Sequence, residues 1–335
     1  MVYMEQEKDK GAVSTTRSLS IVIACYKDGG SVGEFHRRLS EVLPGICSDY
    51  EVIFVNDASP DNAEALLREL AATDPRVVVV NHTRNFGSQN AFLSGMRVAR
   101  GDGIVLMDGD LQDPPALIPD LVARWEDGFD IVYGDRVKRK ETLFRQVAYK
   151  VFYRVFHTLS EVPMPLDAGD FGLIDRKVVH TLLDQFPEHL VFLRGLRAYT
   201  GFRSIGVPYI RDARFDGRTT NSLIRNIQWA KLAIFSFSKK PLEYISLLAI
   251  LCVVATVGMG LFLLASHFIL RTAPPGWTTN TLLLLLLGSV QLVCLAILAE
   301  YMAHMYDELK GRPRYIVRDM VDNRSQDASP TTKPK

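Results

Sequence analysis

The sequence predicts a three-layer α/β domain with a mostly parallel sheet, followed by a hairpin of two transmembrane helices. Up to Lys240, short β-rich apolar runs alternate with amphipathic stretches, at a spacing of roughly 30 residues that is typical of parallel α/β sheets. Beyond Lys240, two long runs contain no Asp, Glu, Lys or Arg. These two observations define the expected fold class.

The composition excludes several classes of protein. The 335 residues include 39 Lys and Arg against 38 Asp and Glu, so the net charge of +1 gives no electrostatic reason to expect nucleic-acid binding. Collagen-like, disulfide-scaffold and disordered classes do not fit the mixture either. The cysteines form no C-x-x-C pair, so we expect small buried side chains rather than a zinc site or disulfides. They are Cys25, Cys47, Cys252 and Cys294.

The elements of the α/β domain follow from hydrophobic periodicity. Strands are predicted at 19–25, 51–55, 76–80 and 103–107, and helices at 32–43, 62–72 and 88–99. Ser59 or Asp61 is expected to cap the helix at 62–72. Ligands of such sheets bind at the carboxyl ends of the strands, so the polar residues found there are candidate ligand-binding residues. They are Tyr26, Asp28, Asn56, Asp57, Asn85, Asp108 and Asp110.

The pair Asp108 and Asp110 suggests a divalent-cation site. Both follow the fourth predicted strand, where alternate residues of an extended segment point the same way. The sequence has no phosphate-binding loop of the G-x-x-x-x-G-K-[ST] type, and no G-x-G-x-x-G follows the first strand. Carboxylates repel a diphosphate, so Mg²⁺ or Mn²⁺ is expected between them, held by one or two carboxylates and phosphate oxygens.

The two apolar runs cover 245–270 and 282–299, and each is long enough, or nearly so, to cross a bilayer. The connection at 271–280 contains Pro274, Pro275, Gly276 and Trp277, and we interpret it as a turn. Basic residues flank the hairpin on its outer ends, whereas the connection has only Arg271, so both ends and the globular domain are expected in the cytoplasm. The expected location is the inner membrane, as a multi-pass protein.

The segments around these spans complete the predicted organisation. No signal peptide is expected, because residues 1–17 are polar. Two amphipathic stretches, 143–159 and 222–237, resemble interfacial helices, although for each a helix packed on the sheet is the alternative. The expected domains are a disordered 1–17, a catalytic domain at 18–220, an interfacial segment at 221–241, transmembrane helices within 242–304 (about 245–270 and 282–302), and a C-terminal segment at 305–335 whose part from Asp322 is disordered.

Several motifs resemble one known family. The run at 108–115 reads D-G-D-L-Q-D-P-P and resembles the D-A-D-L-Q-D-P-P of family 2 glycosyltransferases that act on polyprenyl phosphates, such as dolichyl-phosphate mannose synthases and bactoprenol glucosyltransferases. Similar motifs occur at 55–59 (V-N-D-A-S for V-D-D-G-S), 84–87 (R-N-F-G), 168–171 (A-G-D-F), 298–301 (L-A-E-Y) and 310–315 (K-G-R-P-R-Y). The sequence departs from the family at 24–28 (A-C-Y-K-D), Asn56 and 220–221. These departures concern the donor and the sugar rather than the reaction class.

The resemblance implies a GT-A type fold that transfers a sugar from a nucleotide diphosphate, with UDP favoured, to a lipid phosphate. Asp57 is expected to accept a hydrogen bond from N3–H of the base, Asp28 to meet the base or ribose, and Asp170 to line the sugar pocket. Asp110 and Gln112 are the expected metal ligands, with Asp108 on the ribose and metal side. The expected catalytic residues are Asp108, Asp110 and Asp170, and the nucleotide-sugar site comprises Ala24, Tyr26, Asp28, Asp57, Asn85, Gly87 and Asp108.

The acceptor phosphate needs positive charge but no general base, since a phosphate monoester is already ionised at pH 7. Arg136, Arg145 and Arg218 are the candidate phosphate-binding residues. A single displacement is then expected to invert the anomeric configuration. The alternatives are a processive polysaccharide synthase, which normally has more spans and a Q-x-x-R-W motif, and a non-catalytic membrane regulator with a degenerate transferase fold. The sequence leaves open whether the chain forms a homo-oligomer.

Overall fold

The computed structural model describes residues 14–136, 168–189, 191–211, 238, 240–265 and 276–324. The chain divides into two compact units. The first holds the described residues up to Arg211 and those from Arg312 onward, whereas the second holds the two long helices. The amphipathic segments expected at 143–159 and 222–237 lie outside the described residues.

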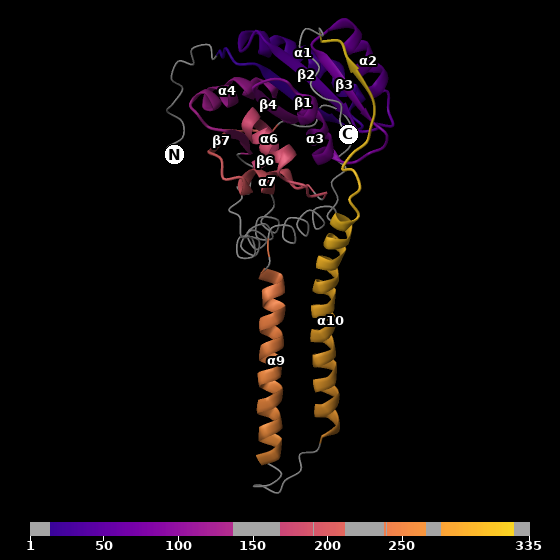
Figure 1. Ribbon diagram of the computed structural model, residues 1–335, viewed down its shortest axis with the longest axis vertical. Helices are drawn as coiled ribbons and strands as arrows, with labels where there is room; N and C mark the ends of the chain where they lie inside the picture. The colour runs from indigo at the N-terminus through magenta and orange to yellow at the C-terminus, as the bar shows by residue number, and fades with distance from the viewer. Residues whose placement is uncertain are drawn as a thin grey trace. The chain divides into compact units, whose positions relative to one another are not determined.

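Eight strands of the described chain form one mixed sheet in the first unit (Figure 1), in the order β7-β5-β6-β4-β1-β2-β3-β8. Its strands are β1 (Leu19–Cys25), β2 (Tyr50–Asn56), β3 (Val77–His82), β4 (Gly103–Asp108), β5 (Ile131–Arg136), β6 (Ala168–Asp175), β7 (Ser204–Tyr209) and β8 (Val317–Asp322). Among them only β6 and β8 run against the others. The carboxyl ends of β1, β2, β3 and β4 therefore meet at one edge.

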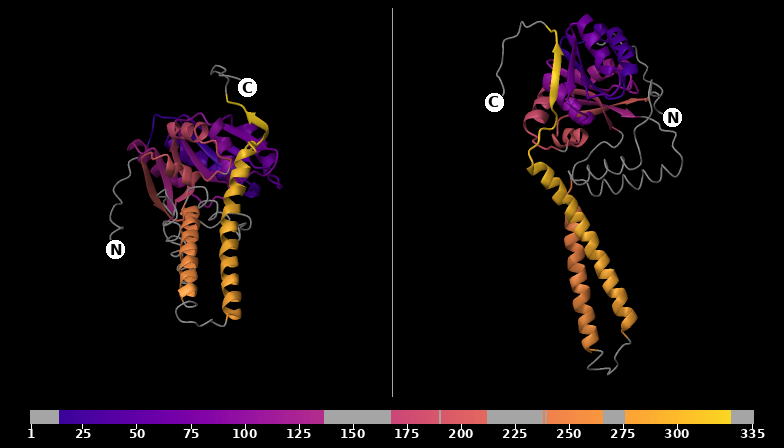
Figure 2. Two further views of the ribbon diagram at one scale, coloured as in Figure 1. Left: turned by 60° about the horizontal axis from the view of Figure 1, so that its bottom comes forward. Right: turned by 90° about the vertical axis from the view of Figure 1, so that its right-hand side faces the viewer.

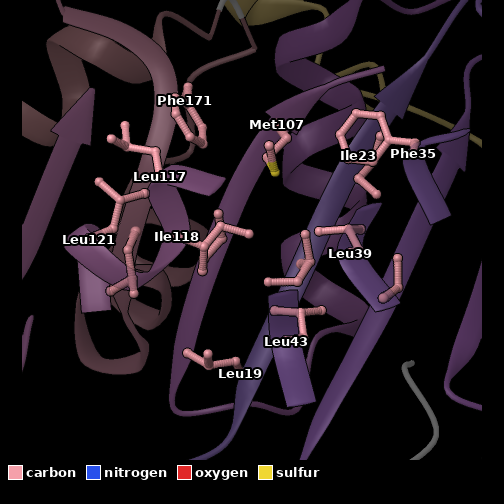
Figure 3. Packing of buried hydrophobic residues seen from close by; sticks show 14 of the residues in the cluster. Leu19, Ile23, Phe35, Leu39, Leu43, Met107, Leu117, Ile118, Leu121 and Phe171 are labelled. Atoms are coloured by element: carbon pink, nitrogen blue, oxygen red, sulfur yellow. The ribbon is translucent and has the colours of Figure 1, made fainter. Parts of the chain in front are cut away.

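Helices cover both faces of this sheet, which gives the predicted three layers. One face carries α1 (Val32–Val42), α2 (Ala63–Thr73) and α4 (Ile118–Glu126), and the other carries α3 (Ser88–Val98) and α6 (Arg176–Asp184). A short helix, α7 (Leu193–Tyr199), contacts β6. Figure 3 shows Phe35 and Leu39 of α1 packed with Ile118 of α4 over Ile23 and Met107 of the sheet. Each of these five side chains is at most 1% exposed.

The seating of α3 depends on one glycine. A Cβ atom at Gly95 would lie 2.2 Å from a methyl carbon of Val22 and 3.1 Å from one of Val55. Any side chain at this position would therefore push the helix off the sheet. The close approach matters for the site, because the amino end of α3 faces the carboxyl ends of the strands.

The predicted strands and helices of the α/β domain are confirmed, with ends that differ by a residue or two. The helix at 62–72 begins after Asn62 rather than after Ser59 or Asp61. Asp61 still serves its first turn, because its Oδ1 accepts the N–H of Ala63 at 3.2 Å. Ser59 instead donates its hydroxyl to Asp61 at 2.6 Å. The polar residues of this turn therefore bind one another before the helix starts.

The first and last described residues of the first unit make tertiary contacts that the sequence did not predict. Thr15 donates its backbone N–H to the carbonyl of Ile46 at 2.8 Å, and the Arg17 guanidinium lies 3.9 Å from the Trp125 ring centroid. At the other end, Arg324 binds Asp322 and Glu51. The expectation of disorder is therefore wrong for 14–17 and for 322–324, because tertiary contacts compensate for their polar composition.

Four strands of the sheet, β5, β6, β7 and β8, were not predicted, and β8 is the most distant of them in sequence. It follows the second long helix in the sequence, yet it pairs antiparallel with β3, and both views of Figure 2 show it along the edge of the sheet. Its sequence V-R-D-M-V-D alternates weakly and leaves Val317 and Met320 exposed, as is common on an edge strand. The chain from 317 to 322 thus belongs to the α/β fold.

The second unit contains α9 (Lys240–Ala265) and α10 (Trp277–Leu309), which contact each other. Both helices are long and apolar enough to cross a membrane, and the best windows are 240–262, with a mean hydropathy of 2.5, and 286–309, with 1.8. Large apolar side chains on them are exposed, including Ile250, Leu284 and Leu292. Such exposure fits a lipid environment better than water.

Helix α10 is longer than expected, whereas α9 has the expected 26 residues but begins at Lys240. Trp277 was expected in the connection, but it starts α10, because neither proline nor glycine follows Gly276 until Gly288. The helix ends where Gly311 adopts a φ of 58°, a left-handed conformation that favours glycine. The N–H of Gly311 donates to the carbonyl of Glu308 at 3.2 Å. Helix α10 therefore extends 33 residues, more than a bilayer crossing requires.

Candidate active site

Three turns at the carboxyl edge of the sheet hold strained backbone. Lys27, Ala58 and Leu111 have positive φ values of 64°, 52° and 55° and follow β1, β2 and β4 respectively. A residue other than glycine pays about 1–2 kcal/mol for this conformation. Strain of this kind is concentrated at functional sites, where the surrounding structure enforces it. These turns carry most of the residues that the sequence singled out.

The turn after β4 places a group of carboxylates together. Asp110 is 5% exposed, and its Oδ1 accepts the backbone N–H of Gln112 at 3.1 Å. The pKa of Asp108 is raised to about 7, first by burial and then by the charges of Asp113, Asp170 and Asp110, while Arg211 lowers it. Burial therefore favours the neutral form of Asp108, and the three neighbouring carboxylates add negative charge that suits a cation.

Asp113 is the centre of a buried cluster beside that turn. It is fully buried, and its Oδ1 accepts the Tyr209 hydroxyl at 2.5 Å and Arg211 Nε at 3.2 Å. Its Oδ2 accepts no hydrogen bond within the described chain, and Arg136 Nη2 lies 3.8 Å from it. Arg136 Nε donates to the Tyr209 hydroxyl at 3.2 Å. One buried carboxylate thus orients two arginines, and Arg211 Nη2 reaches within 4.0 Å of Asp110 Oδ2.

Asp170, on β6, is held by a second set of cations. Arg194 of α7 donates to both of its carboxylate oxygens, and Gln89 Nε2 donates to Oδ2 at 2.8 Å. Arg197 binds the carbonyls of Gly169 and Asp170. Burial raises the pKa of Asp170, but Arg194, Arg197 and Gln89 together hold this pKa below its usual range. Asp170 is therefore an ionised residue in a fixed orientation.

Asp57, at the end of β2, organises the loop before α3. Its Oδ1 accepts His82 Nδ1 at 2.8 Å and the N–H of Phe86 at 2.9 Å, and its Oδ2 accepts the N–H of Gly87 at 2.7 Å. Gly87 has a φ of 89° and is the N-cap of α3. Asp57 as a whole is 2% exposed. Asp57 therefore fixes the R-N-F-G turn, and each carboxylate oxygen has a limited remaining capacity for a ligand.

The remaining predicted nucleotide-sugar residues line the same edge. The Ala24 carbonyl accepts the N–H of Gly109 at 2.9 Å, which joins the ends of β1 and β4. Asp28 Oδ2 accepts the N–H of Tyr26 at 3.1 Å, and the Tyr26 side chain is exposed. Asn85 is exposed in the turn between β3 and α3. Of the predicted phosphate-binding residues, Arg136 lies in the Asp113 cluster, and Arg145 and Arg218 lie outside the described residues.

The residues at this edge fit a divalent cation that is shared with a phosphate ligand. No group of three His, Cys, Asp or Glu side chains in the described ranges could by itself enclose a metal. Mg²⁺ rarely uses such a cage, and it binds one or two carboxylates while phosphate oxygens and water complete its shell. Asp108 and Asp110 supply the two carboxylates, and the charges of the neighbouring Asp113 and Asp170 help to raise the pKa of Asp108.

Sequence reasoning missed several groups of this site: His82, Gln89, Asp113, Arg194, Arg197, Tyr209 and Arg211. Asp113 stands inside the quoted D-x-D-L-Q-D-P-P run, so that motif could have identified it. Arg194 and Arg211 carry no local signal, because a single arginine in a helix or after a strand is usually a solvated charge.

Comparison with known proteins agrees with this arrangement. The profile of Glycosyl transferase family 2 matches residues 20–183. The glycosyltransferase YkcC of Bacillus subtilis (strain 168) is 37% identical over 302 residues, which cover 89% of this chain and 93% of that protein. The glycosyltransferase sll0501 of Synechocystis sp. is 37% identical over 91% of this chain and 96% of its own. A prophage bactoprenol glucosyl transferase homolog of Escherichia coli (strain K12) is 31% identical over 90% and 98%.

The sheet, with its Asp-x-Asp pair at the carboxyl end of β4, defines a glycosyltransferase of the GT-A type. The chain belongs to Glycosyl transferase family 2. The expectations for the fold class and for the family are therefore confirmed.

Proposed function

We propose that this protein transfers a sugar, with inversion, from a nucleotide diphosphate to a polyprenyl phosphate in the cytoplasmic membrane. UDP-glucose or a related UDP-sugar is the proposed donor. The observation that carries the proposal is the Asp108 and Asp110 pair beside the arginines around Asp113, in a family 2 chain with two long apolar helices. Relatives named as bactoprenol glucosyl transferases, such as that of Shigella phage SfV, support the acceptor class.

The donor is proposed to lie across the carboxyl ends of β1, β2 and β4. Asp28 and Asp57 face the nucleoside, and the turn at Gly87 closes the edge of its pocket. Asp108, Asp110 and Gln112 would hold Mg²⁺ or Mn²⁺ on the diphosphate. When bound, the metal supplies Lewis-acid stabilisation of the departing nucleoside diphosphate. Arg211, oriented by Asp113, adds a fixed positive charge beside Asp110.

The acceptor phosphate is proposed to attack the anomeric carbon itself. Its second pKa lies near 6, so it is already ionised at neutral pH and needs no general base. Arg136 can present a planar pair of donors to it, and Arg145 and Arg218 stay predicted partners. Asp170, ionised and paired with Arg194, is proposed to bind donor hydroxyls rather than to remove a proton.

A covalent sugar intermediate on the enzyme is not part of this proposal. Cys25, the thiol at the end of β1, is 1% exposed, and burial followed by the charges of Asp28, Asp61 and Asp108 raises its pKa. It therefore stays protonated and is a poor nucleophile. A single displacement by the lipid phosphate inverts the configuration, so an α-linked UDP-sugar is expected to give a β-linked product.

The test is a transfer assay with purified protein, undecaprenyl phosphate, Mn²⁺ and a panel of labelled nucleotide sugars. We expect a labelled lipid from one UDP-sugar, and NMR of its anomeric centre should show a β-phosphodiester. An α-linked product or a trapped glycosyl-enzyme contradicts the mechanism. Long polysaccharide chains as the product would instead favour the processive synthase. If none of the donors is hydrolysed or transferred, the result would favour the non-catalytic regulator.

A further inference from the structure

The chain that follows α10 contacts the site through one aromatic residue. The Tyr315 ring stacks on the imidazole of His82, with ring centroids 5.5 Å apart and an interplanar angle of 14°. The Phe86 ring meets the same imidazole edge-on, with centroids 5.7 Å apart and an angle of 86°. His82 is 0% exposed. Two aromatic rings therefore fix the imidazole in one orientation.

This orientation decides which nitrogen carries the proton. His82 Nδ1 lies 2.8 Å from Asp57 Oδ1, so it must be the N–H donor to that carboxylate. His82 Nε2 is buried and has no hydrogen-bond partner in the described chain. A bare lone pair at Nε2 is less costly there than an unpaired N–H. Nδ1 is thus the ring nitrogen that donates, and its hydrogen bond serves Asp57.

Asp57, held by His82, in turn fixes the backbone of the proposed donor site. Its oxygens hold the N–H groups of Phe86 and Gly87, and Gly87 caps α3. Two residues further along, Gln89 binds both Asp170 and the N–H of Leu193. The turn that Asp57 fixes is therefore also the start of the segment that reaches the proposed sugar pocket.

The segment around Tyr315 is itself fixed to the sheet. The N–H of Thr83 donates to the carbonyl of Ile316 at 3.0 Å, directly beside His82. Asp319 of β8 accepts from Asn81 at 2.8 Å, and Asn81 in turn accepts from Asn56 at 2.9 Å. Tyr315, Ile316 and Asp319 therefore support both His82 and the end of β2, although they come after the apolar hairpin in the sequence.

We propose that the chain after α10 is part of the donor site, with Tyr315 and His82 as positioning residues. Tyr315 holds the His82 ring, His82 holds Asp57, and Asp57 holds the turn at Phe86 and Gly87 in the conformation that binds a nucleoside diphosphate. Neither Tyr315 nor His82 contacts the substrate in this scheme. The inference rests on the proposed donor site, but it does not depend on the acceptor or on the sugar.

The test measures binding of nucleoside diphosphates, UDP first, to the purified full-length protein with Mn²⁺ by calorimetry. His82→Leu keeps an apolar side chain of similar size but leaves a buried carboxylate without one donor, and we expect the dissociation constant to rise about tenfold or more. His82→Asn offers an amide N–H where Nδ1 was and should stay within about threefold of wild type. Tyr315→Ala should resemble His82→Leu, and Tyr315→Phe, which keeps the ring, should resemble wild type.

Arg318→Ala is the matched control, because Arg318 lies in the same segment but binds Glu64 and Asp319 on the surface. It should leave nucleotide affinity unchanged, since exposed ion pairs contribute little. In transfer assays the His82 and Tyr315 variants should raise the KM for the donor and leave the KM for the lipid phosphate within about twofold.

Three outcomes would overturn the inference. The first is unchanged nucleotide affinity in His82→Leu, whatever its thermal stability. The second is an equal loss of affinity in Arg318→Ala, which would mean that docking of β8 in general matters rather than the Tyr315 and His82 contact. The third is failure of His82→Asn to restore the affinity that His82→Leu loses. If the wild-type protein binds UDP but transfers no sugar to polyprenyl phosphate, the proposed function fails. The binding measurements on the variants still test this inference.

Discussion

Arg194 donates two parallel hydrogen bonds to Asp170, with Nε–Oδ1 and Nη2–Oδ2 distances of 3.1 Å each. This two-point pair joins α7 to β6, and Gln89 connects it to α3. A fork of this kind fixes the direction of a carboxylate as well as its charge. The orientation of Asp170 in the proposed sugar pocket therefore depends on a helix that no motif marks.

Replacement of Arg194 should impair catalysis more than folding. In Arg194→Ala the buried carboxylate of Asp170 loses both hydrogen bonds from the guanidinium. A positioning group displaced in this way can reduce the rate of transfer about 100-fold. The free energy of unfolding should fall by about 1–3 kcal/mol, less than for a fully buried pair because 37% of the Arg194 side chain is exposed. Transfer kinetics and urea unfolding measure the two effects.

Arg194→Lys should recover little of the activity, because an ammonium group cannot form the fork. Arg97→Ala is the matched control, since Arg97 pairs with Asp184 on the surface. Full activity in Arg194→Ala would contradict the role given to this pair.

The same pair predicts how stability depends on pH. The folded protein holds the pKa of Asp170 below its usual value, so the pair's contribution is complete above about pH 4 and is lost as the pH falls further. Arg194→Gln removes most of this shift. Urea unfolding at pH 7 and at pH 3.5 should therefore show a smaller acid-induced loss in the variant than in wild type. An equal loss in both proteins would refute this assignment.

Asp110→Ala should abolish transfer without unfolding the protein. The substitution removes a proposed metal ligand and no part of the core, so we expect a rate at least about 100-fold lower. EDTA should inactivate wild type to the same degree, and added Mn²⁺ or Mg²⁺ should restore it. Asp127→Ala, at the exposed end of α4, is the control and should keep full activity. Turnover in EDTA would exclude the metal.

Ala58→Gly should stabilise the protein. Ala58 has a φ of 52°, which glycine adopts freely, and the resembled V-D-D-G-S motif has glycine at this place. After the greater freedom of glycine in the unfolded chain is subtracted, we expect a gain of about 0.5–1 kcal/mol. Ala72→Gly, on the exposed side of α2, should have the opposite sign. Urea midpoints of both variants test the prediction.

The proposed membrane topology has its own test. Reporter fusions at either end of the chain should give a cytoplasmic signal, and a tag inserted within 272–275 should be accessible from outside the cell. The physical reason is the excess of Lys and Arg on the outer flanks of the two helices. A cytoplasmic signal from the inserted tag would mean that α9 and α10 do not cross the membrane.

The parts of the fold that were predicted correctly are those that produce a local hydrophobic pattern in the sequence. The strand 19–25 is a continuous buried run, and α1 repeats apolar residues at helical spacing, so burial and periodicity alone define them. The same holds for the apolar runs of α9 and α10. Their ends were less accurate, since the residues of 271–280 carry turn signals that stop at Gly276.

The parts that were missed depend on partners distant in sequence. β8 is polar and half exposed, and only its pairing with β3 makes it a strand. His82 showed no metal-ligand spacing, but its partner is a carboxylate 25 residues earlier. Arg194 and Arg211 acquire their roles only when the sheet brings Asp170 and Asp113 beside them. Contacts of this kind leave no periodic signal in a single sequence.

The position of β8 has a consequence for biosynthesis. Translation delivers β3 about 240 residues before β8, with the whole apolar hairpin between them. Throughout that interval the backbone N–H and C=O groups of β3 that will pair with β8 have no partner strand. An open strand edge of this kind can pair with other chains. Completion of the nascent domain therefore waits for synthesis of the hairpin. A ribosome that stalls within α10 would leave an enzyme whose catalytic sheet is still open on one side.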